Sequence, residues 1–151
     1  MKVLLLGAGG QLGKSIQSNF SESINLINLS KKKLSITNKK ALGKAIKLHH
    51  PDFVINAAAY TNVDGAETER NEADKVNNLS LHFLVELSNS YNFTLIHFST
   101  DYVFDGKTKH PYLESNEMKP INYYGLSKSL GDKHIIENCN RYYLFRVSWL
   151  Y

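Results

Sequence analysis

Short apolar runs alternate with longer segments of helical periodicity along the whole chain. The apolar runs end at polar or glycine-containing turns, as is typical of strands buried on both faces, and they predict strands at residues 3–6, 24–29, 53–55, 95–98 and 142–147. Between them, apolar residues recur three or four positions apart. This spacing predicts helices at residues 11–20, 39–48, 72–91 and, beginning at 123 or 124, up to 137.

Regular alternation of strand and helix indicates the α/β class. The connections are long enough for right-handed crossovers, so the sequence predicts a doubly wound, Rossmann-like parallel sheet with flanking helices. The chain ends soon after the last predicted strand, without a further helix to cover it. We therefore expect residues 1–151 to form one domain, truncated before a second, C-terminal domain that is absent from this chain.

Composition narrows the class of protein. A hydrophobic content of 42% with 21% charged residues is ordinary for a soluble globular domain. The net charge of +4 comes mostly from scattered lysines, with a single run at Lys31, Lys32 and Lys33, and this pattern argues against nucleic-acid binding. The first apolar run stops at Gly7, too short for a signal peptide, and no apolar stretch is long enough to cross a membrane.

Cysteine usage favours a reducing compartment. Cys139 is the single cysteine, so no intrachain disulfide can form, and no cysteine and histidine group has the spacing of a zinc site. We expect a cytoplasmic protein without a bound metal.

A glycine-rich segment, Gly-Ala-Gly-Gly-Gln-Leu-Gly at residues 7–13, joins the first predicted strand to the first predicted helix. Gly7, Gly10 and Gly13 follow a G-x-x-G-x-x-G spacing. Such glycines permit a sharp turn and close approach of a ligand, and the free N–H groups of the helix attract an anion. An ordinary glycine-rich turn is the alternative. The position directly after an N-terminal strand favours a dinucleotide-binding site.

The residue after the second strand bears on the choice of cofactor. Domains that bind NAD often carry an acidic residue there to hold the adenosine ribose, whereas this chain has Ser30 followed by three lysines. Lysines would attract the 2′-phosphate of NADP. The sequence therefore favours NADP (NADPH) over NAD, unless the lysines merely solvate a loop.

Tyr124 and Lys128 are four residues apart and share one face of a predicted helix. A nearby ammonium would lower the pKa of a phenol toward the working range of an acid-base catalyst. A tyrosine and a lysine four residues apart also occur by chance. The catalytic interpretation of this pair therefore depends on the presence of the glycine motif in the same chain. Thr100 ends the fourth strand, at the edge where ligands bind in such sheets, and its hydroxyl could reach a substrate carbonyl or merely bond to the loop backbone.

These segments together resemble the extended short-chain dehydrogenase/reductase family over essentially the whole chain. The resemblance implies hydride transfer from NADPH or NADH to the 4-keto group of a nucleotide-linked sugar. It assigns Tyr124 as the proton donor, Lys128 as its pKa partner and ribose anchor, and Thr100 as a third catalytic hydroxyl. The residues that carry the resemblance are Gly10 to Gly13, Asn56 to Asp64, Ser99 to Gly106, Tyr124 to Lys128 and Phe145 to Tyr151.

The same resemblance implies binding roles for other residues. Asp101 and Trp149 would contact the sugar nucleotide, and Asn77 matches an asparagine of the family's central helix. Those that would bind the cofactor are Gly10, Gln11 and Leu12 at the pyrophosphate, Ser30, Ser35 and Ile36 at the adenosine, and Ala59, Tyr60 and Thr61 near the ribose and nicotinamide.

Several alternatives remain open at the level of sequence. Ser30 departs from the acidic residue that is frequent in the family, and family chains are about twice this length. An epimerase or dehydratase of sugar nucleotides would share the glycine motif and the Tyr/Lys pair. A non-catalytic regulatory subunit, such as the β subunit of methionine adenosyltransferase, would bind NADP and a partner protein. Pairing with a second copy, as a homodimer, is also left open.

Overall fold

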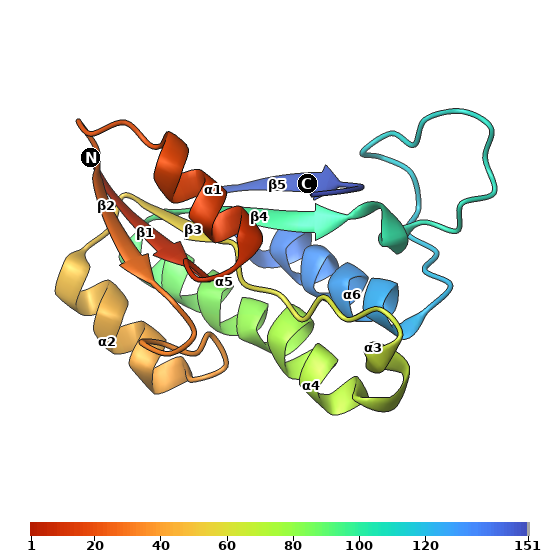
Figure 1. Cartoon of the computed structure of the whole chain (residues 1–151), viewed down its shortest axis with the longest axis horizontal. Coiled ribbons are helices and arrows are strands. Elements are labelled where there is room, and N and C mark those ends of the chain that lie inside the picture. The colour runs from red at the N-terminus through yellow and green to blue at the C-terminus, as the bar shows by residue number, and fades with distance from the viewer. Residues whose placement is uncertain (151) are drawn as a thin grey trace.

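The computed structural model describes residues 1–150 and contains one five-stranded sheet with helices on both faces (Figure 1). All strand pairs are parallel, in the order β2-β1-β3-β4-β5. The strands are β1 (Lys2–Leu6), β2 (Asn25–Leu29), β3 (Phe53–Asn56), β4 (Thr94–Thr100) and β5 (Tyr142–Val147). The predicted Rossmann-like, doubly wound α/β fold is confirmed, with its topological switch point between β1 and β3.

Helices cover the two faces of the sheet unequally. Helix α1 (Gln11–Asn19) lies on one face, whereas α2 (Lys39–His49), α5 (Ser80–Tyr91) and α6 (Tyr123–Asn138) lie on the other (Figure 1). The sheet has a hydrophobic core on each face. Side chains of β1 belong to both cores, because successive side chains of a strand point to opposite faces. Leu4 and Leu6 join the larger core beneath α2 and α5, and Val3 and Leu5 join the smaller core beneath α1.

Asparagine side chains cap the N-termini of two helices. Asn38 accepts a hydrogen bond from the backbone N–H of Ala41 at 3.0 Å and caps α2. Asn122 accepts from the N–H of Gly125 at 2.8 Å and caps α6. The second cap fixes where the helix that carries Tyr124 and Lys128 begins.

The helix predicted at residues 72–91 is confirmed in extent, but it is not one regular α-helix. It consists of α4 (Arg70–Asp74), a π-helical turn (Lys75–Leu79) and α5, and the short α3 (Gly65–Thr68) precedes it. Hydrophobic periodicity over the whole region could not reveal the break, because a π turn adds one residue without disturbing the apolar pattern on either side. Asn77 lies within this turn and bonds to the backbone of Tyr60.

Other connections are irregular. A 3-10 turn (Asp101–Val103) follows β4, and residues 104–122 have no helix or strand. No helix within residues 1–150 is both long and apolar enough to cross a bilayer.

Candidate functional site

The glycine turn, the Ala57–Thr61 loop and Thr100 meet at the carboxyl edge of the sheet. They follow β1, β3 and β4, which are neighbours in the sheet. In open α/β sheets, ligands bind outside this edge at the switch point. The fold therefore gathers segments that lie far apart in the sequence, as the site hypothesis requires.

Close packing requires two glycines of the turn. Gly7 has a positive φ of 76°, and a Cβ there would lie 2.5 Å from the backbone nitrogen of Ala58. A Cβ on Gly13 would overlap the carbonyl oxygen of Gly7. The Gln17 side chain stabilises the turn by donating to the carbonyl oxygens of Ala8, at 2.7 Å, and Gly13, at 2.9 Å. Backbone geometry thus accounts for Gly7 and Gly13.

Neither backbone conformation nor packing requires a glycine at position 10. Its φ of −78° and ψ of 173° suit any residue, and a Cβ there would lie 3.5 Å from its nearest contact, the carbonyl oxygen of Gly7. Gly10 is the N-cap of α1, with no side-chain capping bond, and both Gly10 and Gln11 are exposed. The first turn of α1 therefore presents open backbone N–H groups to solvent, and a phosphate could approach them closely.

The predicted adenosine-binding residues lie in different environments. Ser30 is half-buried beside the glycine turn, since a Cβ on Gly9 would lie 3.4 Å from that of Ser30. Ser35 shares a 2.8 Å hydrogen bond with the Thr37 hydroxyl. Ile36 is 5% exposed and packs in the larger core, so its side chain has little surface left for a ligand. Leu12 is half-buried, and Lys31, Lys32 and Lys33 are exposed in a turn directly after Ser30.

Asn77 fixes the loop that leaves β3. Its Oδ1 accepts from the backbone N–H of Tyr60 at 2.9 Å, and its Nδ2 donates to the carbonyl oxygen of Tyr60 at 3.0 Å. The same Nδ2 lies 3.0 Å from Ser127 Oγ, which donates to the carbonyl oxygen of Tyr124. Asn77 thus joins the β3 loop to α6. Ala59 and Thr61 on either side of Tyr60 are exposed at the sheet edge, and the Tyr60 phenol donates to Glu69.

We expect Asn77→Ala to lower the free energy of unfolding by about 2 kcal/mol, because both backbone groups of Tyr60 lose their partner. Chemical denaturation measures this change. Asn78→Ala is the matched control, since Asn78 lies in the same π turn but bonds to the side chains of Asp74 and His82, and it should cost less than about 1 kcal/mol. Equal losses in the two variants would contradict the bridging role of Asn77.

Tyr124 is held beside Thr100 by the packing of the first turn of α6. Gly125 contacts the carbonyl oxygen of Tyr102 so closely that a Cβ would overlap it. The rings of Tyr102 and Tyr124 meet edge to face, with centroids 5.6 Å apart. The nearby Thr100 hydroxyl acts to lower the pKa of the Tyr124 phenol. In this structure the Thr100 hydroxyl donates to Asp101 Oδ1 at 3.1 Å.

The expectation that Lys128 lowers the pKa of Tyr124 is not met in this structure. Burial is the largest influence and raises the pKa of Tyr124, and Asp101 adds to the rise. Lys128 Nζ instead donates to the carbonyl oxygen of Phe98 at 2.7 Å and lies 3.1 Å from His97 Nε2. The raised pKa suits a proton donor, because the phenol keeps its proton throughout the neutral range.

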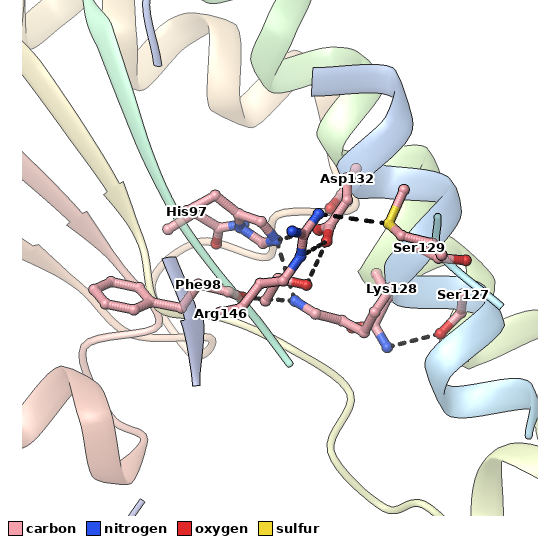
Figure 2. A network of polar contacts seen from close by, with 12 residues as sticks. His97, Phe98, Ser127, Lys128, Ser129, Asp132 and Arg146 are labelled. Carbon is pink, nitrogen blue, oxygen red and sulfur yellow. Dashed lines mark hydrogen bonds and ion pairs between the residues drawn. The ribbon is translucent and has the colours of Figure 1, made fainter. Parts of the chain in front are cut away.

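Lys128 belongs to a buried polar cluster between β4, β5 and α6 (Figure 2). Ser99 donates to Asp132 Oδ2 at 2.5 Å, and Arg146 Nε lies 3.7 Å from the same oxygen. Burial lowers the pKa of Lys128 to about 8, and the Asp132 carboxylate opposes this effect. Lys128 is 2% exposed, so its charge has little contact with water.

A cavity of about 510 Å³ lies beside the 3-10 turn that follows β4. Asp101, which the resemblance predicts to contact a substrate, lies in its wall. Trp149 does not line it and is 74% exposed beyond the end of β5. The remaining lining residues are Tyr102, Phe104, Asp105, Gly106, Pro111, Tyr112, Ile121, Arg146 and Ser148. The lining thus combines aromatic rings with one guanidinium and two carboxylates.

Sequence reasoning missed His97, Asp132 and Arg146. One signal was available for Asp132, because Tyr124, Lys128 and Asp132 recur every four residues on one face of a helix. His97 and Arg146 lie within strand patterns that otherwise read as apolar. Only the pairing of β4 with β5, which sets Ser99 opposite Arg146, brings them to the same place.

Comparison with known proteins gives a consistent result. A family model described as the RmlD substrate binding domain matches residues 1–151. The dTDP-4-dehydrorhamnose reductase of Shigella flexneri is 36% identical over 155 residues, an alignment that includes 100% of this chain and 52% of that protein. The chain spans about half the length of the curated relatives it matches.

Solved structures agree in fold and sequence. The crystal structure of dTDP-4-dehydrorhamnose reductase from Bacillus anthracis, in complex with NADP, has a TM-score of 0.96 and 38% identity, and the match covers 99% of this chain and 54% of that one. A dTDP-4-dehydrorhamnose reductase structure from Clostridium acetobutylicum has a TM-score of 0.95 and 37% identity, covering 100% of this chain and 54% of that one.

Proposed function

Because this chain belongs to the RmlD substrate-binding-domain family, we propose that it is the cofactor-binding part of a dTDP-4-dehydrorhamnose reductase. The reaction would transfer hydride from NADPH to C4 of dTDP-4-dehydro-L-rhamnose and complete the synthesis of dTDP-L-rhamnose. The complete reductase would also contain a C-terminal substrate domain, in keeping with the greater length of the relatives.

One observation carries the proposal. The glycine turn follows β1 and the Tyr124–Lys128 pair lies on α6, where Lys128 bonds to Phe98 of β4, so both face the carboxyl edge of the same parallel sheet. The turn would hold the pyrophosphate, and Lys128 would approach the nicotinamide ribose. Tyr124, protonated because burial raises its pKa, would give its proton to the ketone oxygen while Thr100 orients that oxygen. The bound nicotinamide supplies the hydride.

Consumption of NADPH tests the proposal directly. The full-length protein is mixed with NADPH and dTDP-4-dehydro-L-rhamnose, and absorbance is followed at the nicotinamide band. Turnover that depends on the sugar nucleotide would support the reductase. Binding of NADPH without turnover would contradict it and favour a regulatory subunit, while conversion of other sugar nucleotides without net oxidation of NADPH would favour an epimerase or dehydratase.

NADPH is the proposed cofactor because exposed lysines follow Ser30. We expect replacement of Lys31, Lys32 and Lys33 by alanine to weaken NADPH binding roughly tenfold, since the charges that attract the 2′-phosphate are lost. NADH binding should change by less than about twofold, because NADH has no phosphate at that position. Fluorescence titration with both cofactors measures the two affinities.

Removal of three lysines elsewhere controls for net charge. Lys40, Lys44 and Lys47 are exposed on α2, and their replacement by alanine should leave both affinities within about twofold of the unchanged protein at 0.15 M salt. An equal loss of NADPH and NADH binding in the Lys31–Lys33 variant would contradict the proposed 2′-phosphate contact.

A further inference from the structure

Asn56 and His97 form a buried polar chain behind Lys128 that the proposed reaction does not itself use. Both are 1% exposed. The chain runs from Ala58, in the loop against which Gly7 packs, through Asn56 on β3 and His97 on β4 to Lys128 on α6. It therefore connects the cofactor loop to the catalytic lysine through the interior of the protein.

The direction of each hydrogen bond in this chain follows from its first member. The backbone N–H of Ala58 can only donate, and it lies 3.2 Å from Asn56 Oδ1. Asn56 must then present its NH₂ group to His97 Nδ1, at 3.1 Å. Because an amide NH₂ group cannot accept, Nδ1 is the acceptor. A neutral imidazole that accepts at Nδ1 carries its proton on Nε2.

Two groups in front of His97 Nε2 suit a donor there. Asp132 Oδ1 is buried, has no hydrogen-bond partner among residues 1–150, and lies 4.0 Å from Nε2. Lys128 Nζ lies 3.1 Å from Nε2. An ammonium has three donors and no acceptor, whereas a neutral amine has a lone pair that can accept from an N–H. Nε2–H is thus matched to Lys128 in its neutral form.

We propose that His97 is a positioning residue for Lys128: held in the Nε2–H tautomer by Asn56, it donates to Lys128 Nζ and stabilises the neutral amine. Its meaning for catalysis rests on the reductase function proposed above. Lys128 then gains and loses a proton in the working pH range instead of acting as a permanent charge.

The charged groups around Lys128 act on the same equilibrium. Asp132 on α6 favours the ammonium, but Arg146 on β5 and the Ser99 hydroxyl on β4 share its carboxylate. Tyr124, on the same face of α6, is uncharged because burial raises its pKa. Burial and the nearby lysine hold the pKa of His97 well below its usual value, so the imidazole stays neutral.

The tautomer of His97 is the primary test. Long-range ¹⁵N–¹H correlation spectra of the full-length protein, labelled at histidine, distinguish protonation at Nδ1 from protonation at Nε2. The His97 signals are assigned by their loss in His97→Gln. We expect the proton on Nε2 with Nδ1 unprotonated near neutral pH. A proton on Nδ1, or on both nitrogens, would overturn the proposal without the need for any other variant.

Titration of Lys128 is the second test. In spectra of the protein labelled at the lysine ε-carbon, the Lys128 signal, assigned with Lys128→Met, should titrate at least one pH unit below the exposed lysines. Asn56→Asp presents a carboxylate oxygen to Nδ1, so it should move the His97 proton to Nδ1 and raise the Lys128 midpoint by at least one unit. A raised midpoint with the proton still on Nε2 would reflect charge alone and contradict the proposal, as would an unshifted Lys128 in the unchanged protein.

These measurements are independent of turnover. A protein with the Nε2–H tautomer and a low Lys128 midpoint that does not oxidise NADPH would overturn the proposed function and leave the His97–Lys128 assignment standing. Turnover in a protein whose His97 carries its proton on Nδ1 would support the proposed function and overturn the His97–Lys128 assignment. In an active protein, Asn56→Asp should also shift the pH profile of kcat in the direction of the Lys128 midpoint, which a loss of stability alone would not do.

Discussion

Tyr124→Phe should lower kcat of the full-length reductase by roughly 10²–10⁴-fold, the usual contribution of a general acid. The substitution removes the hydroxyl and keeps the ring, so the edge-to-face contact with Tyr102 remains. NADPH affinity should change by less than about threefold, because the pyrophosphate site at the glycine turn is untouched. Steady-state kinetics with dTDP-4-dehydro-L-rhamnose, together with an NADPH titration, measures both quantities.

The neighbouring tyrosine supplies the control. Tyr123 precedes Tyr124 in α6, and its ring lies against the Arg70 guanidinium, 4.9 Å from ring centroid to carbon. Tyr123→Phe makes the same chemical change one residue away and should leave kcat within about twofold. If Tyr124→Phe kept more than about a tenth of the activity, another group would have to protonate the ketone.

Gly10→Ala should weaken NADPH binding roughly a hundredfold, about 2.8 kcal/mol, with little loss of stability. A Cβ at Gly10 meets no protein atom closer than 3.5 Å, and its φ and ψ suit alanine, so the free energy of unfolding should fall by less than about 1 kcal/mol. The added methyl group would instead occupy the space in front of the α1 N–H groups that the pyrophosphate needs. Cofactor titration and chemical denaturation separate the two effects.

Gly7→Ala is the contrasting variant. A Cβ there would press on the Ala57–Ala58 backbone at a positive φ, so we expect more than about 2 kcal/mol of lost stability, from overpacking and left-handed strain together. Full NADPH affinity in Gly10→Ala would show that the cofactor does not approach this turn. A large loss of stability in Gly10→Ala would contradict the open space found there.

Much of the fold could be predicted because its strands are apolar on both faces. The runs that became β1, β3 and β4 are short and largely buried, and all five strand runs are separated by helical periodicity, so local pattern and long-range structure agree. The edge strands β2 and β5 are only partly buried, and Tyr143 and Phe145 of β5 are exposed. The region before α5 could not be predicted in the same way. The π turn follows from contacts of Asn77 with Tyr60 and Ser127, which are distant in sequence.

The candidate site, like the fold, could be predicted from the sequence only in part. Gly7, Tyr124 and Lys128 carry their own signals, through the glycine spacing and the helical interval of four. The protonation of the Tyr/Lys pair could not be derived from that interval, because it depends on how deeply each group is buried. Burial raises the pKa of Tyr124 and lowers that of Lys128, and Lys128 Nζ donates to the carbonyl oxygen of Phe98 on β4.

The π turn also sets how far this protein can tolerate changes of length. Deleting one residue from Lys75–Leu79 would restore a regular helix and rotate α4 by about 100° relative to α5, which would withdraw Asn77 from Tyr60. The irregular segment at residues 104–122 has no such constraint where it is exposed. Insertions and deletions among natural variants of this domain should therefore be concentrated in that segment and be absent from the π turn.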